Sequence, residues 1–351
     1  MNRFARTLVL VLAAAAGLSA AGPAPSLVDA VKRGDREAVS ALLRAKADVN
    51  KPAPDGTTAL HYAVEADALD LVTQLVRAGA NVKAANRYGI APITLAATNG
   101  SVKVLEALLE AGADPDARIK VHPWYMVYTG CGNGNCGLTN TVGSTAFWRA
   151  AYGTDVDAMK LLVKYGADPN IPTMAPPARG GGAGGRGGGA AFGRGGGPPG
   201  QTPPGGGPDA APPPRTDPSG LPPVPAGGPG VFAIHAAAGV EYGEGFAGNA
   251  HRYAPTGMLA AVKYLVEEVG LDVNSVDDDG NTAVHHAASR GDTDMIRYLV
   301  SKGADVKAVN REGQTTIDLA NGPVQRVQPW PDTIKYLESL GAKNNHKCLS
   351  C

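Results

Sequence analysis

Apolar residues return at helical spacing in short stretches along the chain. In one stretch the apolar positions are Met295, Ile296, Leu299 and Val300. Spacing of i, i+1, i+4 and i+5 gives one apolar stripe on an α-helix, and Gly303 after the stripe is a common signal for a helix C-terminus. A short helix of mostly small residues is expected before it, beginning with Ala283 and Val284 after Thr282, which suits a helix N-cap. The pattern predicts a pair of short helices.

This helix pair recurs along the chain. The phrase that opens each pair is close to Gly-x-Thr-x-x-His, with its glycines at Gly56, Gly89, Gly143, Gly230, Gly280 and Gly313. The phrase that closes it is close to Gly-Ala-Asp-Val, with glycines at Gly79, Gly112, Gly166, Gly270, Gly303 and Gly341. Gly56 and Gly89 are 33 residues apart, and so are Gly280 and Gly313. A fixed period of this size indicates a stacked repeat array, because one helix pair cannot bury its own apolar face.

The two phrases resemble the ankyrin repeat, whose head reads Gly-x-Thr-Pro-Leu-His-x-Ala and whose second helix ends Leu-Leu-x-x-Gly-Ala-Asp-Val-Asn. The resemblance implies an all-α repeat solenoid of about seven helix-turn-helix units, with inter-unit hairpin turns beside a concave, partner-binding face. The family's Pro is Ala or Thr here except at Pro92. The heads at Phe147-Trp148 and Ile317-Asp318 depart further, so a bent geometry stays open for those two units.

The resemblance also implies a structural role for three histidines. His61, His235 and His285 occupy the same position of the head, in the first helical turn. In the family this histidine bonds near the turn of its own or the adjacent unit. Because the three lie one unit or more apart, we do not expect them to form a ligand cluster.

The N-terminus carries an export pattern. Residues 1–21 have a basic start, a short apolar run and small residues at the end, which is typical of a secretory signal peptide. The alternative is an N-terminal membrane anchor, for which the apolar run is short. We therefore expect a periplasmic or secreted protein without a membrane span after cleavage. A truncated first unit follows at 27–50, and Lys46 stands where the repeat expects a left-handed glycine.

Insertions interrupt the array. Residues 172–229 are almost wholly Gly, Pro, Ala and a few Arg, which predicts a disordered linker because they offer no core. The expected segments are repeats one to four at 26–171 with an insertion at 119–142, the linker at 172–229, repeats five to seven at 230–345 with an insertion at 240–256, and a cysteine-containing tail at 346–351. A smaller insert at 321–332 precedes the last helix, expected at 333–340.

The first insertion holds the candidate binding residues. His122, Trp124, Tyr125 and Tyr128 lie close together in a chain with only 5% aromatic residues. In one reading they are anchors for a protein partner, on the finger side where the resemblance places contacts. In the other they fold back over the apolar edge of units three and four.

The cysteines form two close pairs. They are Cys131 with Cys136 and Cys348 with Cys351. In an oxidising compartment this pattern favours two local disulfides over one shared zinc site. Cys348 and Cys351 also have the spacing of a c-type haem motif without its following His. If the natural chain continues past Cys351, a c-type haem motif stays an alternative. For the sequence as it stands, we expect no cofactor and no metal.

The net charge and the sequence motifs limit the classes of function that we expect. Lys and Arg number 32, and so do Asp and Glu, so the neutral chain gives no reason to expect a nucleic acid partner. Three Arg-Gly-Gly triplets are too few to change this expectation. No catalytic motif occurs. We therefore expect a non-enzymatic, monomeric scaffold that binds another protein; the alternative is a redox or electron-transfer protein carrying a haem or a reactive Cys pair.

Overall fold

The computed structural model describes residues 26–120, 141–176, 217–240, 257–322 and 329–348. They form paired helices and no named strand. The inner helices are α1 (Leu27–Lys32), α3 (Ala59–Glu65), α5 (Pro92–Asn99), α7 (Ala146–Tyr152), α9 (Ala233–Ala237), α11 (Ala283–Ser289) and α13 (Thr316–Ala320). The outer helices are α2 (Arg36–Arg44), α4 (Leu69–Arg77), α6 (Val102–Glu110), α8 (Val156–Lys164), α10 (Gly257–Tyr264) with the π-helical turn η2 (Leu265–Val269), α12 (Thr293–Ser301) and α14 (Pro331–Ser339).

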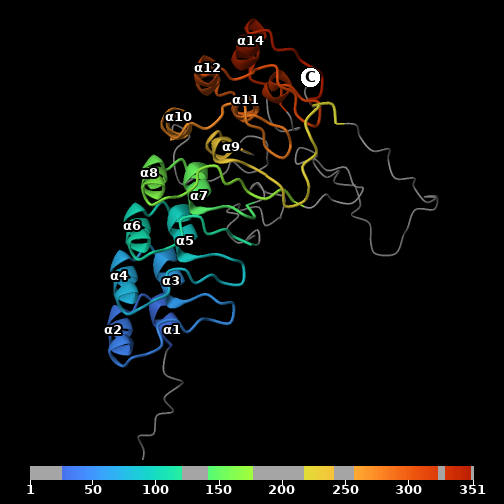
Figure 1. Ribbon diagram of the computed structural model, residues 1–351. Coiled ribbons are helices and arrows are strands. Elements are labelled where there is room, and N and C mark those ends of the chain that lie inside the picture. Colours follow the sequence, from blue (N-terminus) through green and yellow to red (C-terminus); the bar gives the residue numbers. More distant parts are fainter. Residues whose placement is uncertain (1–25, 121–140, 177–216, 241–256, 323–328, 349–351) are drawn as a thin grey trace, which may run out of the picture.

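The helices stack in two layers (Figure 1). The inner helices lie between the outer helices and the loops that join successive units. Each inner helix packs on its outer partner and on the inner helix of the next unit, and α7 packs on α9 while α8 contacts α10. Stacking therefore continues from unit four to unit five across the long insertion. The predicted all-α repeat solenoid of seven helix pairs is confirmed.

The core runs between the two layers along the whole array. Ala59, Leu60, Ala63 and Val64 on α3 are buried, and so are Leu71, Val72 and Leu75 on α4. Small residues on the inner helices let the layers approach, while leucine and valine on the outer helices fill the space between them. Leu299, on the apolar stripe predicted from the sequence, is fully buried, and so is Val284 on α11.

We expect Leu299→Ala to lower the free energy of unfolding by about 2–5 kcal/mol, because the substitution leaves a cavity between α12 and its neighbours. Neighbouring units share one interface, so units six and seven should loosen together. Urea unfolding of the full chain measures the effect, with the exposed Ser301→Ala at the end of the same helix as the control. Equal stability of Leu299→Ala and the wild type would contradict this packing.

The two units with unusual heads keep regular helices. In unit seven, Asp318 takes the place of the histidine and accepts from the N–H (2.8 Å) and hydroxyl (2.9 Å) of Thr315. In unit four, Trp148 takes it, and its indole Nε1 donates to the carbonyl of Val231 in the next unit (2.8 Å). Both replacements retain a hydrogen bond that the histidine makes elsewhere, so neither unit needs to bend.

Two local predictions have clear outcomes. Lys46 adopts the left-handed conformation, with φ at 56°, in the place of the expected glycine. The expected start of the last helix was wrong, because α14 begins at Pro331 rather than at Thr333. Proline favours the first helical position, where its missing N–H costs nothing. Trp330 precedes it and donates from Nε1 to the carbonyl of Ser289 (3.1 Å).

Within the described ranges, no helix is long and apolar enough to cross a membrane.

Candidate binding surface

A tight hairpin joins each unit to the next, and we call it a finger. Finger three (84–90) is closed by Asn86 N–H donating to the carbonyl of Ile90 (3.0 Å) and by Gly89 N–H donating to that of Asn86 (2.8 Å). The same pair of bonds closes fingers two (51–57), six (275–281) and seven (308–314). Gly89 is required here, because its φ is +76° and an added Cβ would lie 2.6 Å from the backbone nitrogen of Lys120.

Both long insertions interrupt fingers at the same point. In finger four, Ile119 N–H donates to the carbonyl of Ser144 (3.2 Å), and Gly143 N–H donates to that of Ile119 (2.9 Å). In finger five, Thr173 and Val231 form the corresponding pair (3.0 Å). The bonds of an ordinary finger are thus retained across 25 and 58 positions of sequence. Because loop closure cost grows slowly with length, such insertions need not disturb the stacking.

Successive fingers are also bonded to one another. Arg87 N–H donates to the carbonyl of Asp55 (2.9 Å), and Lys120 N–H donates to that of Tyr88 (2.9 Å). Arg311 N–H and the carbonyl of Asp279 repeat the contact between fingers seven and six (3.0 Å). These bonds fix the spacing of fingers two to four and of fingers six and seven, so side chains at the tips within each group form a continuous edge.

The repeated histidines are structural, as predicted. His61 Nδ1 accepts the N–H of Thr58 (3.2 Å), and its Nε2 donates to the carbonyl of Ile90 in the next finger (3.0 Å). His235 likewise accepts from Phe232 (3.3 Å) and donates to Ser275 (2.8 Å). Burial lowers the pKa of both histidines, that of His235 to about 4. Both are therefore neutral connectors between units at pH 7.

The sequence interpretation missed a buried acid–histidine pair. His286 Nε2 lies 3.0 Å from Asp277 Oδ2, and the two side chains are 1% and 2% exposed. The other oxygen of Asp277 accepts the N–H groups of Asp279 (3.0 Å) and Asn281 (2.8 Å). Burial alone would raise the pKa of Asp277, but the hydrogen bond from His286 and the backbone donors hold it well below its ordinary value. The carboxylate therefore closes finger six as a charged group.

This pair resembles part of a catalytic triad only in its residue types. The ring of His235 packs edge-on against that of His286, with centroids 5.8 Å apart. The nearby Ser289 hydroxyl donates to the carbonyl of His286 (2.8 Å) and is fully buried. A nucleophile must be reachable by its substrate and lie within reach of the base. We therefore assign the pair to the stability of finger six and α11.

Acidification tests the neutral state of His235. Its pKa is about 4 in the folded chain and near 6.5 in the unfolded chain, so the unfolded chain binds the proton first. Stability from this site should be complete above pH 6.5 and should be lost as pH falls towards 4, by up to about 3 kcal/mol. Urea unfolding from pH 7 to 4.5 measures this slope. His235→Gln should have a shallower slope than the wild type; equal slopes in the two proteins would contradict the assignment.

The inner face is open at one end of the array and closed further along. On α1 and α3, Lys32 and Glu65 are exposed and Tyr62 is partly exposed, with Lys32 Nζ 4.3 Å above the Tyr62 ring. By contrast, every residue of α7 and of α11 is buried. The accessible inner surface among the described residues therefore belongs to units one to three, next to the exposed finger-tip residues Arg87 and Lys120.

The predicted site residues fall mostly outside the described ranges. His122, Trp124, Tyr125 and Tyr128 lie there, and so do Cys131, Cys136 and Cys351. Cys348 is disulfide-bonded. The pairing predicted for the four cysteines, and the binding role of the aromatic residues, stay predictions. In the part of the chain that is described, no three His, Cys, Asp or Glu side chains gather where they could hold a metal ion.

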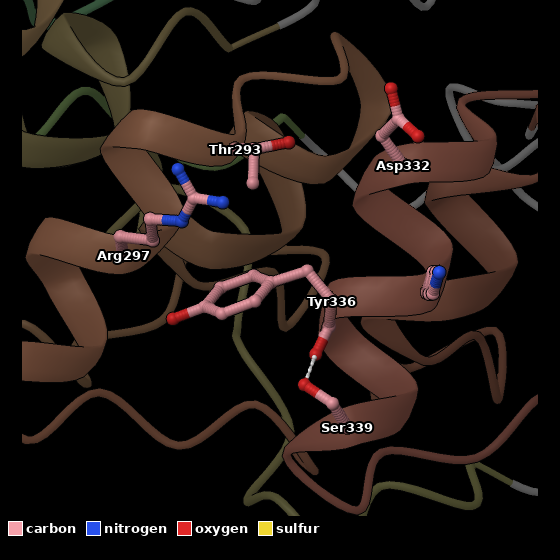
Figure 2. A pocket seen from close by; sticks show the side chains of 6 residues that line it. Thr293, Arg297, Asp332, Tyr336 and Ser339 are labelled. Atoms are coloured by element: carbon pink, nitrogen blue, oxygen red, sulfur yellow. Dashed lines mark hydrogen bonds between the residues drawn. The ribbon is translucent and has the colours of Figure 1, made fainter.

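The outer face has a shallow depression between α12 and α14 (Figure 2). It is lined by Thr293, Arg297, Asp332, Lys335, Tyr336 and Ser339. The Arg297 guanidinium lies over the Tyr336 ring at 5.1 Å, and the Ser339 hydroxyl donates to the carbonyl of Tyr336 (2.6 Å). The first contact joins α12 to α14 and the second lies within α14. Neither pairs a nucleophile with a base, so the depression gives no support for catalysis.

Comparison with known families agrees with this architecture. A family model described as "Ankyrin repeats (3 copies)" matches residues 27–119 and 250–348, and one described as "Ankyrin repeat" matches residues 142–174. Two solved structures are similar to the chain: the human ASB11 ankyrin repeat domain (TM-score 0.53, 16% identity, 89% of this chain and 96% of that one) and the ankyrin repeat domain of Bcl-3 (TM-score 0.51, 21% identity, 90% and 99%). At these identities the likeness shows the fold alone.

Curated relatives match over shorter segments. The chain is 38% identical over 90 residues to alpha-latrocrustotoxin-Lt1a of Latrodectus tredecimguttatus and 37% identical over 95 residues to protein phosphatase 1 regulatory subunit 12A of Rattus norvegicus. It is 42% identical over 69 residues to protein phosphatase 1 regulatory subunit 27 of Homo sapiens. The matches cover 26, 27 and 20% of this chain and 6, 8 and 44% of the relatives' own lengths. The chain thus spans less than half of each of these relatives.

Proposed function

Because the chain belongs to the ankyrin-repeat family, we propose that it is a non-enzymatic scaffold that binds another protein through its fingers and inner face. The observation that carries the proposal is the open inner face of units one to three, which continues into the bonded row of fingers. Relatives named as regulatory subunits of a phosphatase support a binding role rather than a catalytic one. A rigid, solvent-exposed surface of this kind suits a protein partner, because little order is lost when it binds.

The chemistry of this surface indicates how a partner is held. Tyr62 offers a ring under the Lys32 ammonium, and Arg87 lies 4.8 Å over the ring of Tyr88 on finger three. Tyrosine and arginine are the residue types that most often carry binding energy at protein interfaces. The basic residues Lys32, Arg87 and Lys120 outnumber the exposed Glu65 on this surface, so we propose that the partner presents acidic side chains to this edge.

The first insertion is the proposed anchor of the interface. Finger four holds its two ends, and its sequence combines Trp124, Tyr125 and Tyr128 with Cys131 and Cys136. A disulfide across this short stretch would restrict the unbound loop and reduce the entropic cost of binding.

We predict that Trp124→Ala and Cys131→Ser each weaken partner binding by about tenfold or more, while both proteins keep their helix content. The partner is first captured from a periplasmic or secreted fraction, and the dissociation constants are then measured. Tyr336→Ala on the outer face is the aromatic control and should bind like the wild type. Wild-type affinity in both insertion variants would reject the anchor. Unfolding by Trp124→Ala would instead favour a lid over units three and four.

The compartment forms a further part of the proposal. We propose that residues 1–21 are removed as a signal peptide and that the mature protein works in a periplasm or outside the cell. The support is the signal-like sequence together with the closely spaced cysteines, which suit an oxidising compartment. N-terminal sequencing of the protein from a fractionated native host tests it, and an intact Met1 in a cytoplasmic fraction would reject it.

A further inference from the structure

The last part of the Gly/Pro-rich insertion lies across fingers six and seven. This segment, Asp217-Pro218-Ser219-Gly220-Leu221-Pro222, is far in sequence from the fingers it contacts. Arg311 Nη1 pairs with Asp217 Oδ2 (2.6 Å) and lies 3.5 Å from the carbonyl oxygen of Leu221. Arg311 Nη2 donates to the carbonyl of Pro222 (2.7 Å). One guanidinium therefore recognises a carboxylate and the backbone that follows it.

The position of Arg311 is set by bonds to the fingers themselves, independently of the segment. Arg311 Nε donates to the carbonyl of Asp278 (3.0 Å), and its backbone N–H donates to that of Asp279 (3.0 Å). Both bonds are made within fingers six and seven. The guanidinium is thus oriented by the array, with its two Nη groups directed at the segment.

Two glycines make room for the segment's side chains. A Cβ at Gly280 would lie 3.1 Å from Leu221 Cδ1, and a Cβ at Gly313 would lie 3.1 Å from Pro218 Cγ. A Cβ at Gly280 would also lie 3.1 Å from the backbone nitrogen of Arg311, so a larger residue there would disturb the fingers as well as the segment. The finger tips therefore provide a flat floor for one leucine and one proline, on either side of the arginine contact.

The segment holds its own shape by local bonds. Asp217 Oδ1 accepts the N–H (2.9 Å) and the hydroxyl (2.5 Å) of Ser219, and Ser219 Oγ accepts the N–H of Leu221 (3.2 Å). The segment contacts the fingers through the Arg311 guanidinium and the side chains of Leu221 and Pro218, without strand-like backbone pairing. A peptide of the same sequence could therefore make the same contacts without belonging to the chain.

We infer that fingers six and seven form a binding site for an acidic, proline-containing peptide segment, which residues 217–222 fill as an internal ligand. An external partner with an Asp-Pro-x-Gly-Leu-Pro type of segment would use Arg311 and the two glycines, and would have to displace residues 217–222. The site is separate from the open face of units one to three, so its failure would leave the proposed function untouched.

Attachment gives the internal segment an advantage over a free peptide. Pro222 is only five residues from Gly227, whose N–H donates to the carbonyl of Ala175 in the stem of finger five (3.0 Å). Short tethers give effective concentrations on the order of millimolar. If the segment itself binds the site with modest affinity, its competition should weaken the binding of a free peptide by about tenfold.

The test uses the full chain and a labelled peptide with the sequence of residues 217–224. A vacated variant carries Asp217→Ser, Leu221→Ser and Pro222→Ser, which empties the site without changing chain length. By fluorescence anisotropy we expect the peptide to bind the vacated variant about tenfold more tightly than the wild type. Adding Arg311→Gln should remove this gain, whereas adding the outer-face Arg297→Gln should not.

A second measurement keeps the vacated variant as the protein and changes the peptide instead. A peptide with asparagine in place of its aspartate should bind the vacated variant at least about tenfold more weakly than the original peptide, because a charge-assisted bond to Arg311 is lost. The inference is overturned if the vacated variant binds the original peptide no better than the wild type does. It is equally overturned if neither Arg311→Gln nor the asparagine peptide reduces the affinity, since the segment would then be a structural strap only.

Discussion

Replacing Trp148 by alanine is expected to lower the free energy of unfolding by about 3–5 kcal/mol. The side chain is fully buried, and its ring stacks on that of Tyr152, with centroids 5.3 Å apart and planes 8° from parallel. Its Nε1 donates to the carbonyl of Val231, across the point where the 172–229 insertion separates units four and five in sequence. The substitution therefore removes both a large buried side chain and a bond between these units.

A second substitution at this position tests the replacement of histidine. Trp148→His introduces the residue that unit two has at the equivalent position. That residue is His61, whose Nε2 bonds the carbonyl of Ile90 in the next finger. We expect Trp148→His to recover part of the stability lost in Trp148→Ala, measured by urea unfolding of both proteins. If histidine and alanine are equally destabilising, Trp148 contributes only volume, and the proposed equivalence of the two residues is wrong.

The second large effect is expected at Asp277. Asp277→Ala leaves the buried His286 and the N–H groups of Asp279 and Asn281 without their acceptor. Breaking a buried pair by removing one member typically costs about 3–5 kcal/mol. Asp277→Asn keeps an oxygen for the backbone donors but loses the charge, so its loss should be smaller. Thermal or urea unfolding at pH 7 distinguishes the two, and equal stability of Asp277→Ala and wild type would contradict the assignment.

The pH dependence of Asp277 has a defined sign. Its folded-state pKa lies below the ordinary value of 3.8, so the unfolded chain takes up the proton first as pH falls. The stabilisation is therefore complete above about pH 4 and decreases below it. Wild type should lose stability more steeply than Asp277→Asn between pH 4 and 3. The His235 effect occurs at higher pH, between 6.5 and 4, so the two sites can be separated in one titration.

The stacking could be predicted because it depends on residues that repeat. The glycines, the small residues of the inner helices and the stripe that includes Leu299 recur with the period, and each is explained by contacts within a unit or with its neighbour. Trp148 and Asp318 were recognised as departures. Their roles could not be read from the sequence, because each role depends on the atoms that the next finger or tail presents.

The remaining contacts depend on closeness in space rather than on period. Asp277 and His286 meet because finger six turns back onto α11, and no motif marks that pair. The sequence treats 172–229 as one block of Gly and Pro, yet Thr173 bonds Val231, and Asp217 bonds Arg311 from 94 positions away. Composition averages over such a block and cannot show which few of its residues have partners.

The central claim is that partners bind on the finger side of the array, and hydroxyl-radical footprinting of the complex tests it most directly. Four tyrosines serve as reporters of the two faces: Tyr62 and Tyr88 on the finger side, and Tyr165 at the C-terminal end of α8 and Tyr336 on α14 on the outer side. All four are partly exposed. With the captured partner bound, we expect oxidation of Tyr62 and Tyr88 to fall while Tyr165 and Tyr336 react as in the free protein. Protection of Tyr165 and Tyr336, with Tyr62 and Tyr88 unchanged, would contradict the account.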